Sequence, residues 1–449
     1  MSPAASAAMP HPLRVRAGLL LGISMLGGCS SWFGGEEEPP LPGTRISVLE
    51  LERAIEPDPQ VANIDIVLPS AVLEPDWPQV GSRPDHMPGH RALPASLRRA
   101  WSTDIGEGGG GDSRLLTPPV VVDGRIYAMD AGGYVAAFDT DRGRRVWRVR
   151  AASPAEDSDP LGGGVAFGDG RIYVTTGFGE VMALDPANGG LLWRAEANGP
   201  IRSAPTYASG RVFVISIDNQ VEALDATTGE LLWSHTGILE DAALLGGASP
   251  AAGAGVVIVP YSSGELFALR QETGRPAWSD SLATIRRFGA LAGLADVRGN
   301  PVMADDLVIA ISHSGRMAAI DLRSGARVWE QEIGGINMPL VAGEFVFVVT
   351  VNAELVALTK RGGRILWVTP LPRYRNPSDR IGPLVWAGPV LGGDRLIVVG
   401  SNGDAMLVSP YSGEILDTFG VSGSTTIAPV IANGTLYVLS DNAQLAAYR

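Results

Sequence analysis

Two histidines, His86 and His90, have a spacing that could serve metal chemistry. Histidines four positions apart on a helix share one face and can ligate a zinc ion together. A proline and a glycine stand between this pair, and they prevent the helix that would align the two rings. The sequence therefore predicts a surface loop without a metal at this place. His235 and His313 have no clustered partner, and no Ser–His–Asp arrangement or other catalytic residue is predicted.

A glycine-rich run at residues 106–111 has the composition of a loop that could cradle a phosphate. A phosphate-binding loop also needs a Lys followed by Ser or Thr after its glycines, and neither follows here. We interpret the run as a flexible linker. Nucleic-acid binding is not expected either, because the net charge is −13 and the sequence has no basic block that could form a positive face.

Cys29 is the only cysteine in the chain and the residue with the clearest chemistry. It follows Leu-Gly-Gly at the end of an apolar stretch, residues 17–26, which two arginines precede. The stretch is too short to span a bilayer. This arrangement resembles a bacterial lipoprotein signal, in which small residues admit the peptidase and the cysteine carries the lipid, palmitate among its acyl chains. We predict that residues 1–29 are a lipoprotein signal peptide and that Cys29 is lipidated, the alternative being an ordinary cleaved signal.

The residue after Cys29 bears on the destination of the protein. In enteric lipoproteins an Asp at this place favours retention in the inner membrane, so Ser30 by this resemblance indicates the outer membrane. No later stretch approaches eighteen uncharged apolar residues, and we therefore expect a soluble body held on the periplasmic face by its lipid. Without a second cysteine no disulfide is expected, although the compartment is oxidising.

Most of the chain is organised by a repeat with a period of about 45 residues. Each copy has a small residue or proline, an apolar run, a turn, a second apolar run ending in Ala-Leu-Asp, a turn with glycine, and a tryptophan. The tryptophan position of the eight copies is filled by Trp101, Trp147, Trp193, Trp233, Trp278, Trp329, Trp367 and Asp417. Repeats of this length are typical of propellers and solenoids.

The phase of the repeat at the two ends of the chain predicts a closed ring. Each apolar run has four to six residues and is rich in β-branched and aromatic side chains, as strands are. Trp101 precedes every Ala-Leu-Asp signature, and Ala447, the last third-strand position, follows every tryptophan. We predict an all-β, eight-bladed β-propeller of four-stranded antiparallel blades over residues 96–449. An N-terminal outer strand would close this ring with three C-terminal strands, which leaves only short, protected edges.

The tryptophans have a structural explanation in such a ring. A buried indole covers about 150–250 Å² and would dominate the contact between neighbouring blades. Asp417 replaces the tryptophan in the last copy, so we predict that the junction there is the weaker one. Residues 30–95 contain no copy of the repeat and many prolines. We interpret them as an N-terminal tether that partly clamps onto the body, with a wholly disordered tether as the alternative.

The repeat resembles that of quinoprotein-type β-propellers, within which two families compete. One contains the quinone (PQQ)-dependent dehydrogenases, and the other is BamB, the propeller lipoproteins of the outer-membrane β-barrel assembly machinery. The signal ending at Cys29, the segment Pro-Leu-Pro-Gly-x-Arg-Ile-Ser-Val-Leu at residues 40–49 and the bare eight-blade body resemble BamB of alphaproteobacterial type. This resemblance implies a non-enzymatic scaffold that contacts a BamA-type barrel subunit and other assembly lipoproteins, with no cofactor, metal or small-molecule substrate.

The dehydrogenase alternative makes chemical demands that the sequence meets poorly. Such an enzyme needs Ca²⁺ held by carboxylate and amide oxygens beside the quinone, and a carboxylate base. Dehydrogenases of this type usually carry long insertions between blades, and many have adjacent cysteines. Here successive tryptophans of the repeat lie only 38 to 51 positions apart, and adjacent cysteines are absent. A propeller that binds envelope polysaccharide stays open as a third possibility.

Two connections between repeats, residues 239–247 and 286–300, are candidates for a partner surface. In BamB the corresponding loops resemble a docking site for BamA, with Leu and Arg in the first loop and Asp-x-Asp in the second. By position Leu244, Leu245 and Asp296 match, although Leu245 stands where the family has Arg and Arg298 where it has the second Asp. The alternative is that the two leucines simply pack beneath their loop.

Overall fold

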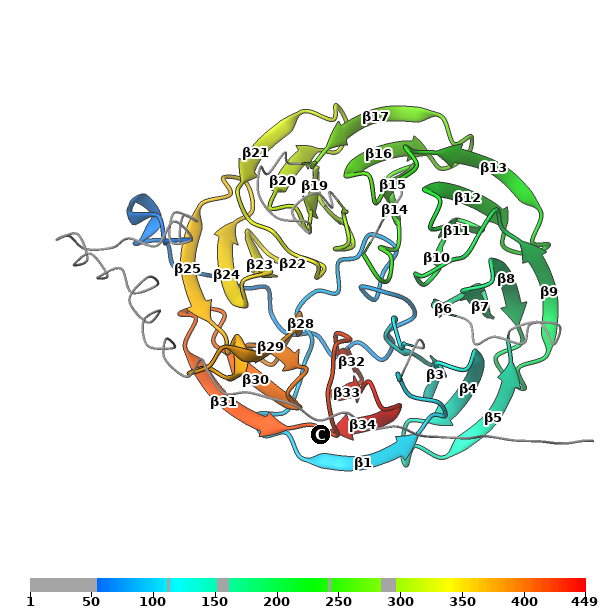
Figure 1. Cartoon of the computed structure of the whole chain (residues 1–449), viewed down its shortest axis with the longest axis horizontal. Coiled ribbons are helices and arrows are strands. Elements are labelled where there is room, and N and C mark those ends of the chain that lie inside the picture. The colour runs from blue at the N-terminus through cyan, green and yellow to red at the C-terminus, as the bar shows by residue number, and fades with distance from the viewer. Residues whose placement is uncertain (1–54, 111–113, 152–160, 241–243, 284–295) are drawn as a thin grey trace, which may run out of the picture. The chain divides into compact units, whose positions relative to one another are not determined.

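The computed structural model describes residues 55–110, 114–151, 161–240, 244–283 and 296–449. Residues 55–449 form one compact unit, in which antiparallel four-stranded sheets are arranged around a ring as eight blades (Figure 1). This confirms the predicted fold. The helical structure described is one 3-10 turn, η2 (Pro59–Val61), and no helix in the described ranges is long and apolar enough to cross a membrane. Cys29 and the predicted signal peptide lie outside the described residues.

The first four blades follow one another along the chain, each with its innermost strand first. Blade 1 contains β2 (Val120–Val122), β3 (Arg125–Met129), β4 (Tyr134–Asp139) and β5 (Arg145–Arg150). Blade 2 contains β6 (Gly163–Gly168), β7 (Arg171–Thr176), β8 (Glu180–Leu184) and β9 (Leu191–Glu196). Blade 3 contains β10 (Thr206–Ala208), β11 (Arg211–Ile215), β12 (Gln220–Asp225) and β13 (Leu231–Thr236). Blade 4 contains β14 (Ala251–Gly253), β15 (Val256–Pro260), β16 (Glu265–Arg270) and β17 (Pro276–Ser281).

The remaining blades repeat this order until the last. Blade 5 contains β18 (Val302–Ala304), β19 (Leu307–Ile311), β20 (Met317–Asp321) and β21 (Arg327–Gln331). Blade 6 contains β22 (Leu340–Ala342), β23 (Phe345–Val349), β24 (Glu354–Thr359) and β25 (Ile365–Pro370), and a hairpin of β26 (Tyr374–Asn376) and β27 (Ile381–Pro383) follows it. Blade 7 contains β28 (Trp386–Gly392), β29 (Arg395–Gly400), β30 (Asp404–Val408) and β31 (Ile415–Gly420). Blade 8 contains β32 (Val430–Ala432), β33 (Thr435–Leu439), β34 (Gln444–Tyr448) and β1 (Arg99–Asp104).

Blade 8 closes the ring with both ends of the repeat array, as the repeat phase predicts. Its outer strand β1 comes from the start of the array and pairs antiparallel with β34 at the end of the chain. Trp101 lies opposite Ala447 in this pairing. Closure therefore depends on backbone hydrogen bonds between segments that are more than 300 positions apart.

The turns between first and second strands explain part of the glycine content. Asp123 and Gly124 both have positive φ, 50° and 72°, and the same pattern recurs at Asn433 and Gly434 with 47° and 66°. Two consecutive residues with positive φ form the tight hairpin whose twist matches that of the strands it joins. Glycine and asparagine occupy such positions at low steric cost.

The seven outer-strand tryptophans seal the junctions between blades. Each indole Nε1 donates a hydrogen bond to a carbonyl oxygen in the next blade, 2.7 to 3.1 Å away. Each ring also lies against a glycine of that blade, where an added Cβ would come within 2.8 Å of the indole. These glycines are Gly143, Gly189, Gly229, Gly274, Gly325, Gly363 and Gly413.

The described part of the N-terminal extension, residues 55–95, runs over the ring and across its middle, in blue in Figure 1. The prediction of a surface loop at His86 and His90 was wrong, because their side chains are buried, with 0% and 5% of the residues exposed. His86 Nδ1 lies 2.7 Å from the carbonyl oxygen of Pro301, and His90 Nδ1 lies 2.7 Å from that of Pro69. The His86 ring thus packs the extension against the propeller, and the His90 ring packs within the extension.

Candidate functional site

The ring has two faces with different connections. Because the four strands of a blade alternate in direction, the first-to-second and third-to-fourth turns lie on one face, which we call the turn face. The second-to-third turns and the connections between blades lie on the opposite face, which we call the loop face. The four residues expected to bind a partner lie on the loop face, on two neighbouring connections: residues 237–250 from blade 3 to blade 4, and residues 282–301 from blade 4 to blade 5.

The structure brings these four residues together. The backbone N–H of Leu244 donates to Asp296 Oδ2 at 3.1 Å, and Arg298 Nε donates to the carbonyl oxygen of Leu245 at 3.0 Å. Each residue of the second connection thus holds one of the two leucines of the first. The two loops are therefore in direct contact through side-chain to backbone hydrogen bonds.

Gly246 allows this contact to be close. Its φ is 101°, and a Cβ added to it would lie 2.3 Å from a terminal nitrogen of the Arg298 guanidinium. The guanidinium therefore lies against the bare backbone of Gly246. A glycine directly after the two leucines was the available sequence signal, since only glycine adopts this backbone easily and leaves room for the arginine.

The carboxylate of Asp296 points inward. The residue is 6% exposed, and its backbone carbonyl accepts the N–H of His313 at 2.9 Å. Burial raises the pKa of the Asp296 carboxyl to about 6, while the hydrogen bond from Leu244 and the charge of Arg298 act in the opposite direction. Burial likewise lowers the pKa of the Arg298 guanidinium, against the attraction of Asp296. Both side chains are placed to support the loop.

The first connection presents exposed apolar side chains above this support. Leu245 is 44% exposed, and Ile238 and Leu239 are 59% and 66% exposed, whereas Leu244 is half-buried. Leu245 thus does not pack beneath its loop. Ile238 is fixed at both polar backbone groups, since its N–H donates to Glu265 Oε2 at 2.8 Å and its carbonyl accepts from Asn219 Nδ2 at 2.5 Å. Sequence reasoning missed Ile238, which the presence of apolar residues just beyond the end of β13 could have indicated.

A cavity of about 130 Å³ lies in the central channel, next to the two connections that carry Leu245 and Arg298. Trp77 lines it together with Arg298, Asn300 and Asn337. Asn300 Oδ1 accepts the N–H of Ser249 at 2.6 Å, and Asn337 Nδ2 donates to the carbonyl of Trp386 at 2.9 Å, so these amides join neighbouring blades.

The residues of this cavity do not fit a quinone with Ca²⁺. No Asp or Glu is among the described residues that line it, so neither a carboxylate ligand for Ca²⁺ nor a carboxylate base is in place. Elsewhere in the described ranges, no group of three or more His, Cys, Asp or Glu side chains is placed to hold a metal ion.

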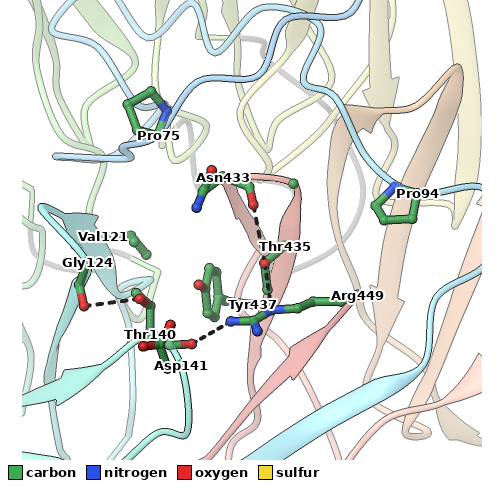
Figure 2. A pocket seen from close by; sticks show the side chains of 11 residues that line it. Pro75, Pro94, Val121, Gly124, Thr140, Asp141, Asn433, Thr435, Tyr437 and Arg449 are labelled. Atoms are coloured by element: carbon green, nitrogen blue, oxygen red, sulfur yellow. Dashed lines mark hydrogen bonds between the residues drawn. The ribbon is translucent and has the colours of Figure 1, made fainter.

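A second cavity, of about 390 Å³, lies where the ends of the repeat array meet (Figure 2). Arg449 lines it, donating from Nη2 to the carbonyl of Thr140 at 2.7 Å and from Nε to Thr435 Oγ1 at 3.1 Å. Pro75 and Pro94 of the extension border the same space. The hydrogen bond to Thr140 links blade 8 to blade 1, so we interpret the arrangement as part of ring closure.

The chain matches the family model described as outer membrane protein assembly factor BamB over residues 95–160 and 131–369. It is 32% identical over 343 residues to the outer membrane protein assembly factor BamB of Salmonella typhimurium, which covers 75% of this chain and 85% of the relative. The corresponding protein of Escherichia coli K12 is 32% identical over 344 residues, with 76% of this chain and 85% of the relative covered.

Solved structures share the fold. The crystal structure of BamB from Moraxella catarrhalis superposes with a TM-score of 0.67 at 21% identity, covering 79% of this chain and all of that one. A quinohemoprotein alcohol dehydrogenase from Comamonas testosteroni has a TM-score of 0.63 at 16% identity, covering 84% and 81%. At such identities the structural likeness establishes the propeller architecture and does not decide between the two activities.

Proposed function

The chain belongs to the family of the outer membrane protein assembly factor BamB, and from this premise we propose that it assists the folding and insertion of outer-membrane proteins as a subunit of the β-barrel assembly complex. The proposed docking surface rests on one observation: buried Asp296 and half-buried Arg298 hold the exposed apolar connection between blades 3 and 4 in place. A scaffold needs such a preformed, exposed apolar surface at which a partner can dock.

We assign the docking contact to the first connection and the support to the second. Leu245, with its exposed neighbours Ile238 and Leu239, would pack against the BamA-type barrel subunit. Asp296 and Arg298 would be positioning residues, because their side chains hold the backbone of Leu244 and Leu245. We do not assign a direct ionic contact with the partner to Asp296, because the residue is only 6% exposed and offers little surface.

The proposed location combines the family with the N-terminal sequence. Lipidation of Cys29 after removal of the signal at residues 1–29 would anchor the protein on the periplasmic face of the outer membrane, where several acyl chains give stable attachment. Residues 30–95 would form the extension and residues 96–449 the propeller domain. Other assembly lipoproteins would be further partners.

We propose a non-enzymatic role. The fold is shared with quinohemoprotein dehydrogenases, but the central cavity offers no carboxylate among its described lining residues. We therefore assign no catalytic, cofactor-binding or metal-binding residue and no small-molecule substrate.

Affinity purification of the tagged full-length protein from detergent-solubilised membranes tests this function. We expect the BamA-type subunit to co-purify with the wild-type protein and to be lost, at least tenfold, from Leu245→Asp. Leu231→Asp is the matched control, because Leu231 is a 58% exposed leucine on the outer strand β13, away from the loop face. Recovery without any barrel-assembly subunit would refute the proposed function, and equal recovery by the two variants would refute the assigned surface.

A further inference from the structure

The innermost strands of the first five blades direct equivalent backbone N–H groups toward the centre of the ring. Each innermost strand has no neighbouring strand on that edge, so its backbone groups need another partner. One N–H of each strand donates to the N-terminal extension. The donors are Val121, Phe167, Tyr207, Ala252 and Met303, on β2, β6, β10, β14 and β18.

Residues 69–93, which we call the central strap, supply the acceptors. Four of these are the backbone carbonyl oxygens of Trp77, Pro78, Pro84 and Asp85, at 2.9, 2.6, 2.7 and 2.9 Å. The fifth is Oε1 of Gln79, at 3.0 Å, whose amide nitrogen donates back to the same strand at 3.4 Å. Proline has a carbonyl but no N–H. A proline-rich segment can therefore accept these N–H groups through its carbonyl oxygens.

The strap also bonds to blades 7 and 8. Arg91 pairs with the edge of β28, since its N–H donates to Leu391 at 3.2 Å and its carbonyl accepts from Gly393 at 2.9 Å. The carbonyl oxygen of Glu74 accepts the N–H of Asn433 at 2.7 Å, in the turn after β32. Seven of the eight blades thus share a hydrogen bond with the strap.

The remaining blade, blade 6, is reached by packing. Pro69 lies against Gly343, where an added Cβ would come within 3.3 Å of the proline ring. Ile66, just before the strap, is 9% exposed and belongs to the apolar core that blade 6 shares with blade 7. Figure 1 shows the resulting path, in which the blue segment crosses the middle of the ring.

The strap is exposed over residues 69–75, but from residue 76 to residue 93 every residue except Arg83 is buried or half-buried. Trp77 is 3% exposed and Arg91 is 4% exposed, with the guanidinium carbon 5.3 Å from the centroid of the indole. The same guanidinium donates to the carbonyl of Pro88 at 2.7 Å and to Ser82 Oγ. The contact between Arg91 and Trp77 and these hydrogen bonds therefore connect separate parts of the strap to one another.

We propose that the central strap is a lock that ties all eight blades together and seals the turn-face mouth of the central channel. Its effect is largest at the junction of blades 7 and 8, where Asp417 replaces the sealing tryptophan. There the chain leaving the strap accepts a hydrogen bond from Arg395 Nη1 at the carbonyl of Ala95, 2.5 Å away. The strap precedes residue 95, at which the family match begins, and its role is independent of the proposed docking.

Substitution within the strap tests the lock in the full-length protein. For the double variant Trp77→Ala, Gln79→Ala we expect the melting temperature to fall by roughly 5–10 °C. We also expect the amide hydrogens of Val121 and Phe167 to exchange at least tenfold faster. Leu73→Ala is the control, because Leu73 belongs to the strap but is 60% exposed and should leave both quantities unchanged. An unaltered melting temperature with unaltered exchange in the double variant would overturn the proposal.

Cleavage after folding covers the case in which the double variant fails to fold. A protease site inserted between Ala95 and Ser96, both exposed, lets the strap be cut from the ring in the native protein. We expect the cut N-terminal fragment to co-elute with the ring in gel filtration and to be released together with ring unfolding as denaturant rises. Free elution of the fragment from a ring with the original melting temperature would overturn the lock.

Discussion

The indole Nε1 of Trp101 donates a hydrogen bond to the carbonyl oxygen of Thr140 at 3.1 Å, across the junction between the last blade and the first. Thr140 lies in the turn between the third and fourth strands of blade 1. The other six tryptophans use the corresponding turn of the blade that follows each of them. The same contact, repeated around the ring, thus joins neighbouring blades at seven of the eight junctions.

The same rule explains the exception at Asp417. The blade that follows this position is blade 8, whose third and fourth strands, β34 and β1, come from opposite ends of the repeat array. No turn joins them, so a tryptophan at position 417 would have no turn carbonyl to bind. The rings of Phe419 and Tyr448, with centroids 5.3 Å apart, occupy this junction instead.

Truncation of a tryptophan that seals a blade junction should lower the stability of the fold. Trp233 is 9% exposed and donates to the carbonyl of Gln271 at 2.8 Å. We expect Trp233→Ala to lower the free energy of unfolding by about 3–5 kcal/mol, because it removes the buried ring and leaves a cavity. Chemical denaturation measures the effect. A loss below about 1 kcal/mol would contradict the sealing role.

The glycine beneath each tryptophan should be less replaceable than an open turn glycine. Gly274 has φ 66° and would place a Cβ 2.5 Å from the Trp233 ring, whereas Gly170 has φ 69° with nothing within 4 Å. Gly170→Ala should cost about 1–2 kcal/mol for the left-handed backbone alone. Gly274→Ala carries the same backbone cost and adds a steric clash of about 1–3 kcal/mol. Equal effects of the two substitutions on unfolding would show that the contact is unimportant.

The sequence predicted the ring because the residues that mark each copy of the repeat have strong structural preferences. The positions of Trp101 and Ala447 were sufficient to predict closure through β1 and β34. The sequence predicted a tether that partly clamps onto the body, but not the path of the strap. The prolines of the strap follow no period, and its partners are backbone N–H groups, which residue type does not reveal. For the same reason the sequence could not indicate that His86, within the strap, is buried against the ring.

For the candidate site, the sequence indicated two loops and four of their residues, but not the direction in which the side chains point. The Asp296 side chain can face either a partner or the loop. It faces the loop because it accepts the N–H of Leu244, a residue 52 positions away in the sequence. Arg298, which departs from the family pattern, can support the loop because its guanidinium lies against Gly246. Neither relationship follows from the local sequence pattern.

Stability should depend on pH through Asp296. Its pKa is about 6 in the folded state against an ordinary value of 3.8, so between these values the folded protein holds a proton that the unfolded chain has lost. The stabilisation is full below the unfolded pKa and is lost as pH rises through the folded pKa, up to about 3 kcal/mol. In Asp296→Asn this component should vanish. Denaturation of both proteins at pH 4 and pH 7 checks this, and an identical pH dependence would contradict it.

Membrane attachment should depend on Cys29. In Cys29→Ala we expect no incorporation of labelled palmitate and a shift of the protein from the membrane fraction to the periplasmic fraction, because the acyl chains provide the attachment. Fractionation with Ser30→Ala as a lipidated control measures this. Retention of Cys29→Ala in the membrane fraction would show that another contact anchors the protein.

The most direct test of the central claim is crosslinking in living cells from a photoreactive amino acid at position 245. The loop held by Asp296 and Arg298 exposes this side chain on the loop face, where we place the docking contact. We predict a crosslink to the BamA-type barrel subunit from position 245 and none from position 231 on the outer strand. Absence of that crosslink from position 245, with the protein folded and membrane-bound, would contradict the proposed docking surface.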